Sequence, residues 1–167
     1  GGVRLIGRSH ECDFPANILD RPDLTRGAIE FAGASSSEID EAVSSSIGAG
    51  RPLYEVDVAL LAELKPDLIV TQDLCSVCSI DLESVRRIAA SLRPQPRILS
   101  LNPTSFEDVL DDVLRIGEAV ALEARAQEVV VGLRDRFFRA AGRATPSVEG
   151  PRALLRAWTG PPVVGGP

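Results

Sequence analysis

The chain has 167 residues, of which 44% are hydrophobic and 25% charged, as in globular proteins with a substantial core. Its formal net charge is −6, and Lys65 is the only lysine among its 18 basic residues. Because no basic stripe is available to neutralise phosphates, this balance argues against nucleic acid as a partner. No stretch approaches 18 consecutive apolar residues, so we expect no direct insertion into a membrane.

The two ends of the sequence predict an incomplete protein. The chain begins Gly1-Gly2-Val3 and contains no methionine, so we expect a processed or trimmed product or a fragment. Its last residues, 161–167, complete no predicted element. No signal peptide is visible, and the N-terminal residues therefore give no prediction of the compartment.

Short apolar runs alternate with helical patterns along the chain. The predicted strands are 4–7, 53–56, 67–71, 97–101 and 152–158, and the predicted helices are 35–46, 57–64, 82–92, 105–117 and 122–142. Ser35 and Glu38 form a capping-box pattern, Asp57 is placed to cap the second helix, and 16–34 is predicted as a surface excursion. This alternation predicts an α/β fold built on a parallel sheet.

Three loops are predicted to meet at one edge of that sheet. Strands 4–7, 67–71 and 97–101 should be parallel, so the loops that follow them lie at their shared carboxyl ends. Those loops carry the only histidine and all three cysteines of the chain. Since ligands bind at this edge in open α/β sheets, the sequence predicts a binding site there.

The cysteines leave three interpretations open. His10 and Cys12 are two residues apart, so on an extended loop both point to the same side, and with Cys75 and Cys78 they make a ligand set suited to zinc or iron. Alternatively, the cysteines are small buried residues beside a locally hydrogen-bonded histidine, or Cys75 and Cys78 form a redox or disulfide pair. No catalytic triad or phosphate loop is recognisable, so we do not expect an enzyme.

Three motifs together resemble a known family. They are Ser-His-Glu-Cys-Asp-Phe-Pro at 9–15, Leu-Lys-Pro-Asp-Leu-Ile-Val-Thr-Gln-Asp-Leu-Cys-Ser-Val-Cys at 64–78, and Leu-Ser-Leu-Asn-Pro-Thr-Ser at 99–105. The chain resembles cobalamin-binding-protein-like substrate-binding proteins of ABC transporters, which belong to the helical-backbone class of periplasmic binding proteins. The stretch 64–70 is typical of the wider superfamily, whereas the cysteine-bearing motifs are more specific.

The resemblance implies two α/β lobes joined by one long helix, with the ligand held between them. Residues 1–104 then correspond to a Rossmann-like N-terminal lobe without its first strand and helix. Residues 105–143 correspond to the helix that ends this lobe and the long backbone helix, and 151–167 to the start of a truncated second lobe. Residues 157–160 depart from the family pattern, because acidic residues are absent around Trp158.

The resemblance also implies a function. A protein of this family captures cobalamin or a related corrinoid by shape and apolar burial, without a cofactor of its own, and delivers it to the permease of an ABC importer. The implied ligand-binding residues are His10, Glu11, Asp13, Phe14, Gln72, Asp73, Asn102, Thr104 and Trp158. The implied location is periplasmic or otherwise extracytoplasmic, although the free cysteines leave the cytoplasm open. The alternative functions are a metal-binding protein on the same fold, with zinc or iron at His10, Cys12, Cys75 and Cys78, and a thiol redox protein.

Overall fold

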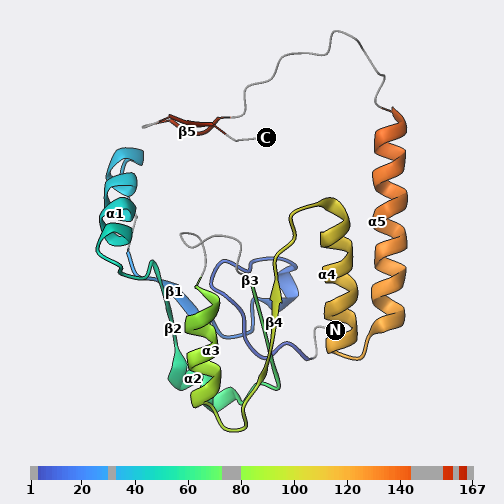
Figure 1. Ribbon diagram of the computed structural model, residues 1–167, viewed down its shortest axis with the longest axis horizontal. Helices are drawn as coiled ribbons and strands as arrows, with labels where there is room; N and C mark the ends of the chain where they lie inside the picture. The colour runs from blue at the N-terminus through green and yellow to red at the C-terminus, as the bar shows by residue number, and fades with distance from the viewer. Residues whose placement is uncertain (1–3, 30–32, 73–79, 144–155, 160–161, 165–167) are drawn as a thin grey trace.

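The computed structural model describes residues 4–29, 33–72, 80–143, 156–159 and 162–164, and it has the predicted α/β character (Figure 1). The helices are α1 (Ser36–Gly48), α2 (Val58–Leu64), α3 (Leu82–Ser91), α4 (Phe106–Ala119) and α5 (Glu123–Arg143), with a 3-10 turn, η2, at Ala16–Ile18. The strands are β1 (Thr25–Gly27), β2 (Tyr54–Val56), β3 (Leu68–Gln72), β4 (Arg97–Leu101), β5 (Arg156–Thr159) and β6 (Pro162–Val164). Within these residues, no helix is both long and apolar enough to cross a membrane.

A parallel pair of strands forms the centre of the fold. β3 and β4 pair in parallel, with Gln72 opposite Leu101, so both strands end at the same edge as predicted. The intervening helix α3 packs on the pair and buries Val85 and Ala89, which are 7% and 1% exposed. The edge formed by these two carboxyl ends is therefore confirmed.

The predicted strand at 4–7 is wrong. Leu5 and Ile6 are 36% and 40% exposed, and within the described residues β3 pairs only with β4. The Arg4 side chain donates to the carbonyl oxygen of Val120 at the end of α4, and the Arg8 carbonyl accepts from the Leu24 N–H at 2.8 Å. These contacts place residues 4–8 beside the end of α4 and the segment before β1. The apolar residues of this segment therefore do not form a strand of the parallel sheet.

One strand of a small antiparallel ladder, β1, lies inside the predicted surface excursion. β1 pairs with β2, with Thr25 opposite Val56 and Gly27 opposite Tyr54. The extended piece at 54–56 agrees with its prediction, whereas β1 was expected to be irregular. A strand of three residues is too short to show an alternation of apolar and polar side chains. The extended conformation of β1 therefore depends on its pairing with β2.

The predicted helix starts are confirmed by their capping contacts. Ser35 Oγ accepts from the Glu38 N–H, and the Glu38 carboxylate accepts from the Ser35 N–H at 2.7 Å, which completes the capping box of α1. The Asp57 carboxylate accepts from the Leu60 N–H at 2.9 Å and caps α2. α2 ends at Leu64 and is capped by Lys65, whose φ of 49° is left-handed, just before Pro66.

An extensive contact joins α4 and α5, which lie side by side in opposite directions (Figure 1). Leu110 of α4 is fully buried, and Val130 of α5 is 5% exposed. At Gly117 the backbones come so close that a Cβ would lie 2.3 Å from the Ala126 Cβ. The predicted break is confirmed at Ala121, whose φ is 54°, and α5 has the expected length at 21 residues.

The last described strands, β5 and β6, form an antiparallel pair of their own. In this pair Trp158 is opposite Val163, and the register shifts between Arg156 and Trp158. The predicted strand 152–158 therefore agrees at 156–158, while 152–155 lie outside the described residues.

Candidate functional site

The loop that carries the histidine is a tight turn. The Cys12 N–H donates to the Ser9 carbonyl at 2.9 Å, which closes a turn around His10 and Glu11. The extended backbone assumed in the prediction that His10 and Cys12 point to the same side is therefore absent, and that prediction loses its basis.

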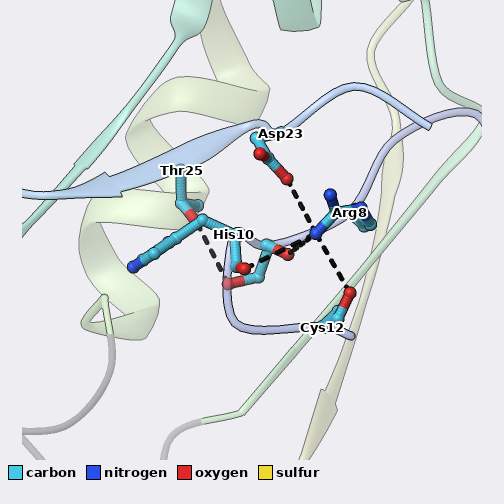
Figure 2. Close-up of polar contacts among 6 residues, drawn as sticks. Arg8, His10, Cys12, Asp23 and Thr25 are labelled. Carbon is cyan, nitrogen blue, oxygen red and sulfur yellow. Dashed lines mark hydrogen bonds and ion pairs between the residues drawn. The ribbon is translucent and has the colours of Figure 1, made fainter. Parts of the chain in front are cut away.

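A nearly buried guanidinium holds this turn in place (Figure 2). The Arg8 side chain is 11% exposed, and its Nη1 atom lies 2.8 Å from Asp23 Oδ1 and 3.0 Å from the Cys12 carbonyl oxygen. The carbonyl oxygens of Ser9 and His10 lie 3.2 and 3.5 Å from the same nitrogen. One cation therefore connects both ends of the turn to the segment that leads into β1, and charge-assisted bonds of this kind are among the stronger ones.

Thr25 of β1 orients the imidazole of His10. Its Oγ1 accepts from the His10 backbone N–H at 3.1 Å and lies 2.7 Å from His10 Nδ1. Ser9 Oγ is 3.0 Å from the same hydroxyl. The Tyr54 ring is tilted by 46° to the imidazole, with 5.9 Å between the ring centroids. The half-buried imidazole is thus fixed at its backbone and at one ring nitrogen.

His10 lines a hollow of about 630 Å³ beside the short ladder. The lining residues come from the turn, β1, β2 and the start of α2, and they are His10, Asp23, Leu24, Thr25, Arg26, Val56, Asp57, Val58 and Ala59. Arg26 pairs with Glu55 at 2.5 Å, and the hydrogen bond and charge of Glu55 raise the pKa of Arg26. The hollow therefore combines apolar walls with an imidazole and with ionic groups that have partners.

A second hollow of about 400 Å³ lies at the carboxyl ends of β3 and β4. It is mainly apolar and is lined by Val70, Thr71, Gln72, Leu101, Pro103, Val109, Asp112, Val113 and Ile116. Gln72 thus lies at this hollow, whereas His10 lines the other. The sequence placed both at one edge because it assumed that 4–7 was a strand of the same sheet.

The loop after β4 is a helix start. The N–H and hydroxyl of Thr104 donate to Asp108 Oδ2 at 2.9 and 2.8 Å, and Ser105 Oγ accepts from the Asp108 N–H at 3.1 Å. Asn102 is exposed, with its Oδ1 3.5 Å from Ser100 Oγ. These contacts give Thr104 a structural partner, and they lower the pKa of Asp108.

The remaining residues of the histidine loop face solvent. Glu11, Cys12 and Asp13 are exposed, and Phe14 is 85% exposed. Cys12 is a free thiol, so the interpretation of the cysteines as buried residues is wrong at this position. Phe14 is the most exposed of the large apolar side chains among the described residues, so its ring is available for a contact with a ligand.

The other predicted ligands cannot be placed around His10. Asp73, Cys75 and Cys78 lie outside the described residues, and Trp158 belongs to β5. In the part of the chain that the structure describes, no three His, Cys, Asp or Glu side chains form a group that could hold a metal ion. The predicted set of one histidine and three cysteines is therefore neither assembled nor excluded.

Sequence reasoning missed the residues that support His10. Arg8, Asp23 and Thr25 are separated along the chain and follow no motif spacing. The one signal in the sequence that could have indicated this support is Arg8, which directly precedes Ser9 and His10 and is followed further along the chain by its partner Asp23. Comparison of the chain with protein-family models, with curated proteins and with solved structures found no match.

Proposed function

We propose that this chain binds a corrinoid, cobalamin or a close relative, as part of a solute-binding protein that delivers its ligand to an ABC importer. The observation that carries the proposal is the loop at 9–15. Arg8 and Thr25 hold this loop, which contributes an imidazole to a hollow and exposes Phe14 to solvent.

The geometry supports a binding role for this loop. Small-molecule sites are hollows of about 300–1,000 Å³ with apolar walls and a few fixed polar groups. The hollow at His10, at about 630 Å³, has this size and this mixture. A corrinoid is a broad, largely apolar ring with polar side chains, so it would occupy the hollow and extend over the exposed loop.

The rest of the fold supports the same family. The parallel pair β3–β4 and the 21-residue helix α5, about 32 Å long, are the parts that a helical-backbone binding protein requires. The motifs at 9–15, 64–78 and 99–105 point to the corrinoid-binding branch of that class.

The test is equilibrium dialysis of the chain against hydroxocobalamin, with retention followed by visible absorbance. Phe14→Ser should weaken binding about 10-fold, because the exposed ring would lose its apolar burial against the ligand. Phe138→Ser is the matched control, since Phe138 is also exposed, at 65%, but lies on α5. Absence of retention by the unmodified chain would sink the proposal, and equal losses in both variants would remove Phe14 from the site.

A further inference from the structure

The two ring nitrogens of His10 have different surroundings. Among the described residues, every hydrogen bond of the imidazole ring is made by Nδ1, to Thr25 Oγ1 at 2.7 Å. Figure 2 shows the other ring nitrogen on the far side of the ring, directed away from Thr25 and Arg8. The residue lines the hollow, so Nε2 is the ring atom placed to meet a ligand there.

The hydrogen bonds around His10 can be satisfied by the tautomer in which Nδ1 carries the proton and the Nε2 lone pair is free. If Nδ1 carries the proton, Thr25 Oγ1 accepts from both the backbone N–H and Nδ1 of His10, and its own proton goes to Ser9 Oγ at 3.0 Å. Both N–H donors of His10 and the Thr25 hydroxyl then have an acceptor. Metal-ligating histidines are oriented in this way, with the second nitrogen donating to a fixed protein group.

Thr25 is itself held by two elements. It pairs with Val56 in the β1–β2 ladder, and the neighbouring Leu24 carbonyl accepts from the Asp57 N–H at 2.9 Å. The hydroxyl that holds the imidazole therefore belongs to a short side chain whose backbone is fixed by neighbouring elements. A ligand atom fixed in this manner loses little conformational freedom when it binds.

From this geometry we infer that His10 Nε2 coordinates the cobalt of the bound corrinoid at an axial position. The inference rests on the proposed corrinoid function and adds the atom that binds the metal. The corrin ring occupies the equatorial positions of the cobalt, so one protein nitrogen is sufficient. Coordination displaces an axial water and forms a nitrogen–cobalt bond without change in the oxidation state of the metal.

Two cobinamides test the inference, since neither carries the nucleotide base that competes for the axial position in cobalamin. Aquocobinamide has exchangeable axial waters, whereas dicyanocobinamide has both axial positions filled by cyanide. We expect aquocobinamide to bind with a red shift of its visible bands, matched by adding free imidazole to aquocobinamide alone. Dicyanocobinamide should bind without a shift and at least about 10-fold more weakly.

Variants of His10 and Thr25 distinguish the contribution of the metal bond to affinity from the contribution of the shape of the hollow. His10→Gln should abolish the band shift and weaken aquocobinamide binding by about 100-fold, which is the upper end of the 10- to 100-fold loss typical of a residue that supports a metal ligand. Its affinity for dicyanocobinamide should change less than about twofold. Thr25→Val should cost about 10-fold for aquocobinamide, and Thr25→Ser should recover it, because serine keeps the hydroxyl that orients Nδ1.

The outcomes distinguish this inference from the proposed function. Equal binding of both cobinamides without a band shift would overturn axial coordination while leaving corrinoid binding intact. A shift that persists in His10→Gln would also overturn it, because another group would then be the ligand. Retention of neither cobinamide would reject corrinoid binding itself. Far-UV circular dichroism and the urea midpoint of His10→Gln confirm that the variant is folded.

Discussion

The α4–α5 hairpin and the loop around His10 are held together by different physical means. The hairpin is stabilised by burial, with Leu110 fully enclosed and Gly117 against Ala126. The loop has exposed or half-buried residues, and its position depends on Arg8 and on hydrogen bonds to Thr25. Polar contacts fix direction but each contributes only about 0.5–1.5 kcal/mol, or about 1.5–3 kcal/mol where one group is charged. The candidate site can therefore be altered without unfolding the chain, whereas the hairpin cannot.

The largest effect is expected from a cavity in the hairpin. Leu110→Ala should lower the free energy of unfolding by about 2–5 kcal/mol, because a fully buried leucine loses its contacts and leaves a void. Urea unfolding followed by circular dichroism measures this. Val131→Ala is the control, since Val131 is 68% exposed and should change the free energy by less than about 0.5 kcal/mol. Similar losses in the two variants would contradict the assignment of the main core to this hairpin.

A smaller but more specific effect is expected at the contact between the two helices. Gly117→Ala should destabilise by about 1–3 kcal/mol, because its Cβ would lie 2.3 Å from the Ala126 Cβ and force the helices apart. Adding Ala126→Gly should restore part of the loss by removing the second methyl group. Gly132→Ala has open space around it and should stabilise α5 by up to about 1 kcal/mol. If Gly132→Ala destabilises as much as Gly117→Ala, the close contact with Ala126 does not account for the loss at Gly117.

The loop should respond locally to a change at Arg8. Arg8→Gln removes the charge that pairs with Asp23 and contacts the Cys12 carbonyl, at a cost of about 1 kcal/mol since Asp23 is half exposed. The amides of Cys12 and Leu24 should exchange with deuterium faster, while those of Leu110 and its neighbours stay protected. A uniform increase in exchange along the chain would show that loop and hairpin are not independent.

The smallest effect is an acid dependence of the helix starts. The N–H of Thr104, then its hydroxyl, then the side chain of Ser105 lower the pKa of Asp108 below its ordinary 3.8. Because the folded pKa is the lower one, this stabilisation is present above the unfolded value and is lost as the pH falls through the folded value. In Asp108→Asn, the free energy of unfolding should therefore decrease less as the pH falls below about 4 than it does in the unmodified chain. Urea midpoints measured from pH 6 to pH 2 test this, and an unchanged pH profile would contradict it.

Much of the fold follows from local signals in the sequence. β4 has the predicted bounds, and the start of α1 and the break near Ala121 agree because capping residues and apolar periodicity act over a few neighbouring residues. The strand predicted at 4–7 failed because pairing depends on a distant partner that an apolar run does not specify. The support of His10 depends on β1, which exists only through its pairing with β2. Tertiary contacts of this kind leave no period in the sequence.

The ladder between β1 and β2 has three residue pairs and supports the orientation of His10 through Thr25. Two-stranded ladders of this length are marginally stable by themselves. On heating, the alignment of the imidazole should therefore be lost before α4 and α5 melt, and the ring-proton NMR signals of His10 should change at a lower temperature than the helical dichroism. The working temperature range of the site would then be narrower than that of the fold, and a bound ligand that bridges His10 and the ladder would widen it by mass action.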